Sequence, residues 1–226
     1  MTSSSSIYEK LLELPLFQGH SKEDLTYILT KIKVDFRTYH RGQTLTRQDD
    51  PCRELFFLME GELRTERTSQ RKDLIFVEYY NSPTTFGMET IFGLRQNYNQ
   101  SIIASTESKI FVVDKYAIIN YLFHFDVFRY NMLNALTTRI QQTERLLWMT
   151  TEESIEQAFI QLCKRNFTRP AGYKIIEGGM VSLAHTMNRS RIQVSNMLNS
   201  FENNGLVKLN RKKIIMPRLE KLIASI

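Results

Sequence analysis

Residues 181–216 read VSLAHTMNRSRIQVSNMLNSFENNGLVKLNRKKIIM, and this stretch decides the fold of the C-terminal third. Its first part has the spacing of two short helices joined by a tight turn. Asn188 falls at the turn, four residues after the small Ala184, and asparagine tolerates a positive φ better than most non-glycine residues. Ser190 is suited to cap the second helix. We therefore predict a helix, a turn and a second helix over residues 181–204.

The second helix has one apolar face, because Val194, Leu198 and Phe201 recur at the i, i+4, i+7 spacing. Gly205 ends the helical pattern, and LVKLNRKKIIM then reads as a β-hairpin with residues 210–213 at its tip. Two helices followed by a basic two-stranded wing describe a winged helix-turn-helix.

The outward face of the second helix is polar, and its residue types are those that read DNA bases. Arginine pairs with guanine, and asparagine or glutamine pairs with adenine. A recognition helix makes these contacts with its first turns. We therefore predict base readout by Arg191, Gln193 and Asn196. Side chains near the turn and in the wing are predicted to contact phosphates instead: Arg189, Ser190, Lys208, Arg211, Lys212 and Lys213.

The charge of the chain is concentrated in the same third. The 226 residues have a formal net charge of +6, yet residues 1–150 hold 18 basic and 18 acidic side chains. Residues 151–226 hold 12 basic and 6 acidic side chains. Such a segment is expected to bind a polyanion. Its basic residues flank polar base-reading groups and no apolar insertion face, so we expect double-stranded DNA as the partner and no membrane. The alternative is a ligand-binding or protein-interaction module that uses the winged helix as a docking surface without specific DNA binding.

The region before the winged helix has a different pattern. Two short helical segments are followed, between residues 34 and 114, by about eight short β-rich segments, which is typical of a jelly roll. A long helical stretch comes next. The predicted fold is α+β, with an N-terminal antiparallel β jelly-roll barrel, a long helix and a C-terminal winged helix-turn-helix. The predicted domains are residues 1–114 for effector sensing, 115–150 for dimerisation with a hinge at 150–153, and 151–226 for DNA binding.

The long helix has a stripe with the 3-4-3-4 spacing of a two-stranded coiled coil. The predicted dimer seam consists of Leu133, Leu136, Ile140, Thr143 and Leu147. Such a stripe also fits simple packing of the helix onto its own barrel, and this alternative stays open. With a seam of this kind the protein is a homodimer, and it should read a roughly palindromic site.

The sequence contains no pattern that indicates catalysis or metal binding. The four histidines are scattered, the two cysteines (Cys52 and Cys163) are far apart, and no Gly-rich phosphate loop, GxSxG or HExxH motif is present. We therefore expect no catalytic residues, no metal and no enzyme activity. The absence of a signal-peptide pattern and of a long apolar run predicts a cytoplasmic protein.

Four stretches together resemble the cAMP receptor protein/FNR (Crp/Fnr) superfamily of bacterial transcription regulators. They are LPLFQGHSKEDL (14–25), YHRGQTLTRQDDPCRELFFLMEGELR (39–64), TFGMETIFG (85–93) and residues 181–216. The resemblance covers almost the whole chain. It implies a cyclic-nucleotide-binding-like effector barrel, a dimerising helix, a winged helix, and a role in transcription regulation that includes RNA polymerase as a partner.

The departures from that family concern the effector. Members that bind cyclic nucleotides have a Gly-Glu pair and, about ten residues later, an Arg-Ser pair whose arginine holds the cyclic phosphate. Here Glu89 is retained, Met88 replaces the glycine and Gln100-Ser101 replaces the second pair. A neutral glutamine cannot make the charge-assisted bond, so the sequence argues against cyclic AMP.

Two cysteines are also too few for the iron–sulfur cluster of FNR-like members. No known cofactor is therefore expected, and we predict a small organic effector other than cyclic AMP. The predicted effector pocket consists of Tyr79, Tyr80, Phe86, Gly87, Met88, Glu89, Gln100, Ser101 and Thr143.

Overall fold

The computed structural model describes residues 7–32, 35–147 and 154–226. The chain forms two compact units, each built from separate stretches of sequence. The first unit consists of Met1–Arg64 and Tyr80–Gln141, and the second of Thr65–Tyr79 and Gln142–Ile226. These boundaries differ from the predicted domains at residues 114 and 150, because residues 65–79 belong with the C-terminal third.

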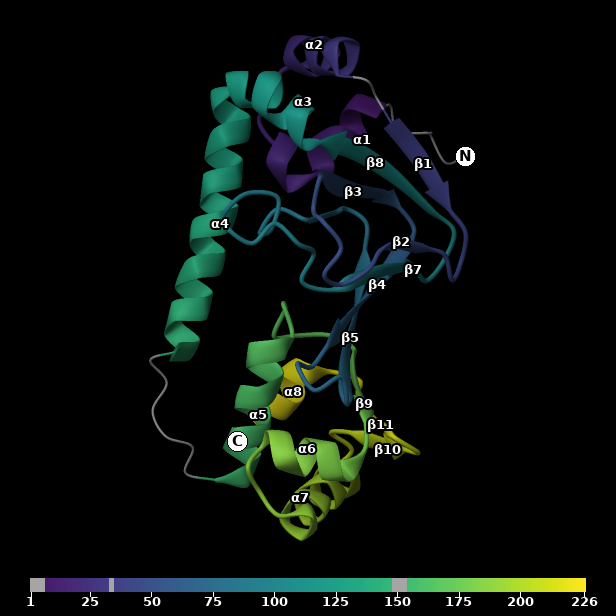
Figure 1. Cartoon of the computed structure of the whole chain (residues 1–226), viewed down its shortest axis with the longest axis vertical. Coiled ribbons are helices and arrows are strands. Elements are labelled where there is room, and N and C mark those ends of the chain that lie inside the picture. The colour runs from purple at the N-terminus through teal and green to yellow at the C-terminus, as the bar shows by residue number, and fades with distance from the viewer. Residues whose placement is uncertain (1–6, 33–34, 148–153) are drawn as a thin grey trace. The chain divides into compact units, whose positions relative to one another are not determined.

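The helices and strands follow the order that the sequence predicts (Figure 1). In the first unit they are α1 (Ile7–Glu13), η1 (Pro15–Phe17), α2 (Lys22–Lys31), β1 (Asp35–Tyr39), β2 (Thr44–Thr46), β3 (Glu54–Glu60), β6 (Thr84–Phe86), β7 (Ser101–Ala104), β8 (Ser108–Asp114), α3 (Lys115–Asn120) and η2 (Leu122–His124). Three elements run from one unit into the other: β4 (Glu62–Thr68), β5 (Leu74–Asn81) and α4 (Asp126–Leu147). The second unit contains α5 (Ile155–Asn166), β9 (Lys174–Gly178), α6 (Met180–Thr186), α7 (Arg191–Asn203), β10 (Lys208–Asn210), β11 (Lys213–Met216) and α8 (Leu219–Ala224).

The first unit is an antiparallel β-domain, and the α+β fold predicted from the sequence is confirmed. One sheet has the strand order β1-β8-β3-β6, and β2 pairs with β7. The start of α2 is fixed by its cap: the Ser21 hydroxyl accepts a hydrogen bond from Asp24 N–H, and the Asp24 carboxylate accepts one from Ser21 N–H. This reciprocal capping box satisfies two backbone N–H groups that a helix leaves unpaired.

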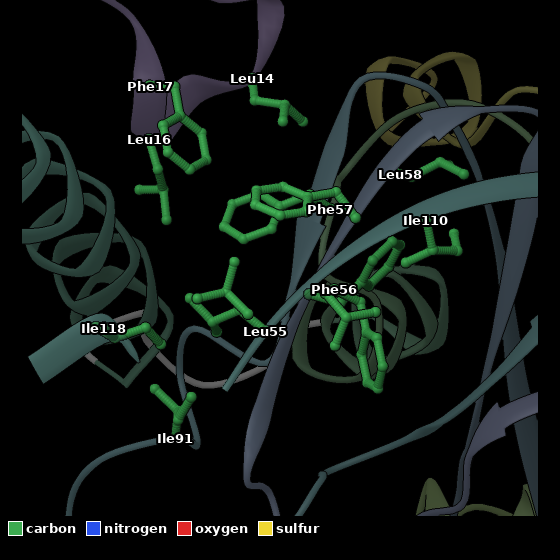
Figure 2. Close-up of a cluster of buried hydrophobic side chains, with 14 of the residues drawn as sticks. Leu14, Leu16, Phe17, Leu55, Phe56, Phe57, Leu58, Ile91, Ile110 and Ile118 are labelled. Atoms are coloured by element: carbon green, nitrogen blue, oxygen red, sulfur yellow. The ribbon is translucent and has the colours of Figure 1, made fainter. Parts of the chain in front are cut away.

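Aromatic side chains hold the core of the first unit together (Figure 2). The ring of Phe57 in β3 lies 5.2 Å from Phe17 of η1 and 5.5 Å from Phe111 of β8, between ring centroids. Phe17 in turn lies 5.6 Å from Phe128 of α4. Aromatic pairs at these spacings add to the stabilisation from burial. The N-terminal half of α4 is thereby fixed to the barrel strands.

The second unit is a winged helix with an additional strand. Its strands follow the order β10-β11-β9-β5 with three antiparallel pairings, and the sheet continues beyond β5 to β4. Strand β9 is the one described strand between α5 and α6, and β5 pairs with its free edge in the register Leu74↔Gly178 to Glu78↔Lys174. A strand edge left without a partner exposes backbone N–H and C=O groups. Strand β5 therefore completes the sheet of the winged helix.

Two side chains of β5 belong to the core of the second unit. Leu74 is 1% exposed and Phe76 is 2% exposed, and they pack with buried residues of α5 and α7 such as Phe159 and Phe201. The ring of Phe76 meets Phe167 edge-on at 5.7 Å. Residues 65–79 are thus part of this unit by packing as well as by strand pairing.

A buried ion pair joins β5 to β9. Lys174 Nζ lies 3.1 Å from Glu78 Oε1, and the two side chains are 1% and 3% exposed. The Glu78 carboxylate also accepts hydrogen bonds from Thr168 N–H (2.6 Å) and Arg169 N–H (3.2 Å). Burial lowers the pKa of Lys174, and the adjacent Glu78 opposes this effect by favouring the charged amine.

Helix α4 has one face toward the core of the first unit and one toward solvent. Phe128 and Met132 are buried, and Leu136 packs against that core. Leu136 therefore does not lie with the exposed residues of the predicted dimer seam. The 150–153 hinge and the side chain of Leu147 lie outside the described residues.

Candidate functional site

The turn between α6 and α7 has the geometry that the sequence predicts (Figure 1). Asn188 has a φ of +51°, and its N–H donates to the carbonyl of His185 at 3.0 Å. Arg189 N–H donates to the carbonyl of Ala184 at 3.0 Å. The left-handed residue reverses the chain direction within three residues, so that α7 follows α6 in a helix-turn-helix.

The start of α7 is fixed by a reciprocal cap. The Ser190 hydroxyl accepts from Gln193 N–H at 3.2 Å, and the amide oxygen of Gln193 accepts from Ser190 N–H at 3.0 Å. The predicted cap at Ser190 is therefore present. Gln193, predicted only as a base reader, therefore also has a capping role, and it is exposed.

The two faces of α7 are sharply different. Val194 and Leu198 are fully buried, and Met197 and Phe201 are 3% and 5% exposed. The predicted base-reading residues Arg191 and Asn196 are both exposed. Ile192 was not among the predicted base readers, yet it is 74% exposed and lies between two of them. Ile192 lies outside the i, i+4, i+7 pattern of the buried apolar residues, and this is the sequence signal that indicates an exposed apolar position.

The wing presents basic side chains around a two-residue turn. Asn210 pairs with Lys213, and the exposed Arg211 and Lys212 form the tip, where Lys212 has a φ of +59°. Lys208 is exposed on β10. Lys213 differs from the others because its Nζ lies 2.7 Å from Glu177 Oε1, so part of its charge is already neutralised.

The other predicted phosphate contacts lie in the turn. Ser190 is exposed, and the guanidinium of the half-buried Arg189 donates to the carbonyl of Asn188 at 3.3 Å. All six predicted phosphate contacts thus belong to the second unit, as do the three predicted base readers.

Several residues of the predicted effector pocket cluster in the first unit. The rings of Tyr80 and Phe86 meet edge-on at 5.1 Å between centroids. Gly87 follows with a φ of +93°, and a Cβ there would come within 2.9 Å of the carbonyl of Glu54. Glycine is therefore required at this position both for its backbone conformation and for space.

The remaining residues of the predicted pocket in this unit are more exposed to solvent than Tyr80 and Phe86. Met88 and Gln100 are half-buried and Glu89 is exposed. The hydroxyl of Ser101 accepts a hydrogen bond from Gln48 N–H at 3.0 Å.

Two residues of the predicted pocket belong to the other unit. Tyr79 is the last residue of the second unit's β5 segment, and its ring meets Tyr173 edge-on at 5.7 Å. Thr143 lies on an exposed turn of α4, also within the second unit. Tyr79 and Thr143 are thus assigned to the second unit, whereas Phe86 and Gly87 belong to the first.

The segment from Gly87 to Ser101 contains one basic residue, Arg95. Its guanidinium lies 3.0 Å from Asp49 Oδ1, and both side chains are well exposed. With Gln100 neutral, this segment has no buried cation to hold a cyclic phosphate. Within the described residues, this segment therefore lacks the phosphate-binding arginine that the family resemblance implies.

Cys52 lies beside Gly87 and is 2% exposed. Its thiol donates to the carbonyl of Gly87 at 3.6 Å, and burial raises its pKa. A thiol of this kind is inert toward oxidants and electrophiles, because the thiolate is the reactive form.

Three large apolar side chains of α4 are exposed to solvent. Leu133 and Ile140 of the predicted dimer seam are 58% and 64% exposed, and Tyr130, one turn earlier, is 64% exposed. Tyr130, Leu133 and Ile140 recur at intervals of three and seven residues. They form one stripe, which we call the α4 stripe.

The described part of the chain offers no cluster of metal ligands. Within residues 7–32, 35–147 and 154–226, no group of three or more His, Cys, Asp and Glu side chains is placed to hold a metal ion. No helix in these ranges is long and apolar enough to span a bilayer.

Comparison with known proteins agrees with this architecture. The family model described as cyclic nucleotide-binding domain matches residues 36–124. The global nitrogen regulator of Synechococcus elongatus is 22% identical over 191 residues, which are 81% of this chain and 86% of that protein.

Solved structures match at the level of the fold. The catabolite activator protein of Thermus thermophilus has a TM-score of 0.54 at 19% identity, over 93% of this chain and 99% of that one. The sensor domain of the transcriptional regulator DNR from Pseudomonas aeruginosa has a TM-score of 0.51 at 23% identity, over 64% of this chain and 99% of its own. The fold that the resemblance implies is thus confirmed: the chain shares the fold of the catabolite activator protein, and its residues 36–124 match the family model of the cyclic nucleotide-binding domain.

Proposed function

We propose that the chain is a homodimeric, sequence-specific DNA-binding transcription regulator, controlled by a small-molecule effector other than cyclic AMP. The observation that carries the proposal is the capped helix α7, which buries Val194 and Leu198 and presents Arg191 and Asn196 to solvent. These are the side chains that read guanine and adenine in the major groove. A relative that is named a global nitrogen regulator supports a regulatory role.

Phosphate contacts come from the same unit. The wing residues Lys208, Arg211 and Lys212 are exposed on the hairpin of β10 and β11. Between residues 164 and 218 the chain has 11 basic side chains and only two acidic ones, Glu177 and Glu202. Such a surface neutralises phosphates and fixes the orientation of the protein on the duplex.

The homodimer rests on the α4 stripe. A second copy of the same stripe is the partner that we propose, because Tyr130, Leu133 and Ile140 repeat along one helix face with coiled-coil-like spacing. Two copies would present two α7 helices to half-sites about one helical turn apart. RNA polymerase as a further partner rests on the family resemblance alone.

The effector proposal rests on residue chemistry. Gln100 stands at the position where the resemblance implies a phosphate-binding arginine, and Arg95 is exposed and paired with Asp49. The buried rings of Tyr80 and Phe86 and the half-buried Met88 form an apolar and aromatic environment near Gly87. A small organic effector with an apolar part fits these residues better than a cyclic phosphate does.

The DNA-binding proposal is tested by selecting duplexes from a random library with the full-length protein, followed by fluorescence anisotropy of the selected site. We expect a palindromic consensus and affinity that falls steeply with salt. Replacing Arg211 and Lys212 with alanine should reduce the slope of log K against log[salt] by about 0.9 for each phosphate that is no longer neutralised.

Lys221→Ala is the matched control, because Lys221 is an exposed cation on α8; its slope should equal that of the wild type. A library that yields no preferred sequence at any salt concentration would show that the proposal is wrong. Calorimetric titration with cyclic AMP tests the effector proposal, and binding of cyclic AMP at micromolar concentrations would contradict it.

A further inference from the structure

The centre of the outward face of α7 is occupied by an apolar residue. An α-helix advances about 100° per residue, and the buried Val194, Met197, Leu198 and Phe201 define the inward direction of α7. On that projection Ile192 points about 170° away from the mean inward direction. Arg191 and Gln193 lie about 100° to either side of Ile192, at the edges of the outward face.

The surroundings of Ile192 are polar. Ser195, Asn196 and Asn199 lie on the same side of the helix, within about 60° of Ile192 on the same projection. Ile192 is 74% exposed. Scattered exposed aliphatic residues are common and need no explanation by themselves. Here the position matters, because a lone isoleucine at the middle of a polar reading face does not form the apolar patch that a protein partner would need.

We propose that Ile192 determines specificity by contacting the C5-methyl group of a thymine in the major groove, an inference that rests on the proposed DNA binding. Among the standard bases only thymine presents a methyl group there. An isoleucine has no hydrogen-bond donor or acceptor, so the other three bases offer its side chain no group that it can recognise.

The local structure prepares Ile192 for this contact. It is the second residue of a helix whose start is fixed by the reciprocal cap between Ser190 and Gln193. Its β-branched side chain is stiff at χ1. The first turns of a recognition helix are the part that meets base edges. The apolar group is therefore held in one direction before DNA arrives.

Asn196 follows Ile192 by four residues on the same side of α7 and is exposed. Its amide can make two hydrogen bonds to an adenine. The geometry thus predicts a half-site in which a methyl-read thymine lies close to an adenine read by Asn196, with Arg191 at the edge of the contact.

The experiment uses the full-length protein and the duplex selected from a random library. Each thymine of one half-site is replaced in turn by deoxyuridine, which lacks the methyl group but keeps every hydrogen-bonding group. At one position we expect the wild-type protein to lose about fourfold in affinity, equivalent to about 0.8 kcal/mol for one buried methyl-sized group. Ile192→Ala should bind the thymine duplex more weakly and show no change on the substitution at that position.

Two controls separate this contact from general damage. Val181→Ala removes another exposed aliphatic side chain, 67% exposed on α6, and should keep the fourfold response. Arg191→Ala should lower affinity yet keep the response. Equal melting temperatures of wild type and Ile192→Ala would establish that the substitution leaves the fold intact, as expected for an exposed helix position.

Sensitivity to deoxyuridine at one position, lost in Ile192→Ala, supports the inference. A wild-type protein that binds its selected site but ignores every deoxyuridine overturns the role of Ile192 and leaves DNA binding standing. A response that persists in Ile192→Ala has the same consequence. If the selection yields no specific site, the proposed function itself fails and the inference fails with it.

Discussion

Replacing Glu78 by glutamine tests whether residues 65–79 are an integral part of the winged-helix unit. The substitution keeps the size of the side chain, and the amide oxygen can still accept from Thr168 N–H. It removes the charge that faces Lys174, whose side chain is 1% exposed. Breaking a buried ion pair from one side leaves the other charge uncompensated, which costs about 3–5 kcal/mol.

A double variant and a control variant test the same reasoning. In Glu78→Gln the charge of Lys174 has no partner, and adding Lys174→Met removes that charge. The double variant should therefore be more stable than Glu78→Gln alone, although neither charge of the native pair remains. Glu177→Gln is the matched control, because the side chains of its ion pair with Lys213 are 34% and 48% exposed and therefore partly in contact with solvent. Exposed pairs typically contribute less than about 1 kcal/mol.

The same variant has a predictable dependence on pH. Burial lowers the pKa of Lys174 in the folded state, and loss of the Glu78 charge removes the effect that opposes this shift. Between the folded and the unfolded pKa of the lysine, the unfolded chain binds more protons, so stability must rise with pH in that window. Glu78→Gln should therefore regain part of its loss as the pH is raised from 7 toward 10.

Scanning calorimetry of the full-length protein is the appropriate assay, because a chain with two compact units need not unfold in one step. For a unit of roughly 100 residues, 3–5 kcal/mol corresponds to a decrease in melting temperature of at least about 10 °C. The reasoning is refuted if Glu78→Gln melts within about 2 °C of the wild type, or if the double variant is no more stable than Glu78→Gln.

Four further substitutions or treatments test other parts of the structure. Phe76→Ala should destabilise the second unit by about 3–5 kcal/mol, because the ring is 2% exposed in the core of that unit. Calorimetry measures the loss. A change confined to the melting transition of the first unit would contradict the assignment of Phe76 to the second unit. Asn188→Ala should cost about 1 kcal/mol at the left-handed turn, whereas Asn188→Gly should be tolerated, as judged by melting temperature. Ile140→Asp places a charge in the α4 stripe and should shift the protein from dimer to monomer in analytical ultracentrifugation; a variant with unchanged mass would argue against the stripe as the seam. Cys52 should react with iodoacetamide only on unfolding, since it is 2% exposed and its pKa is raised, and rapid alkylation of the native protein at pH 8 would contradict its burial.

Local signals in the sequence identified the helix-turn-helix because its determinants are local. The positive φ at Asn188, the cap at Ser190 and the inward face led by Val194 each depend on residues within a turn or two of helix. The hairpin of the wing has the same property, since a short turn fixes the pairing of the flanking strands.

The role of β5 could not be found in this way, because strand pairing joins residues that are about 100 positions apart in the chain. The stretch LIFVEYY indicates a strand buried on both faces but does not name its neighbours. One signal was present: Glu78 lies inside this apolar run, and a carboxylate at a buried position requires a partner. Lys174, in the strand before α6, is that partner.

Strand geometry also bears on two tyrosines of the predicted effector pocket. Successive residues of a strand point to opposite faces, so Tyr79 and Tyr80 cannot both face one pocket. The structure places Tyr79 against Tyr173 of the second unit and Tyr80 against Phe86 of the first. Both tyrosines were assigned to the predicted pocket by residue type alone. The alternation of side chains along β5, which places them on opposite faces, is not visible in residue type.

The winged-helix unit is connected to the rest of the chain at three points and not at one: between residues 64 and 65, 79 and 80, and 141 and 142. A fragment cut at the predicted boundary, residues 151–226, would lack Leu74 and Phe76 from its core and leave the edge of β9 unpaired. It would also hold Lys174 without Glu78. Such a fragment should expose apolar surface and associate through its open strand edge. DNA-binding experiments with the isolated C-terminal third would then measure a damaged domain, so the base and phosphate contacts proposed for α7 and the wing must be tested in the full-length protein.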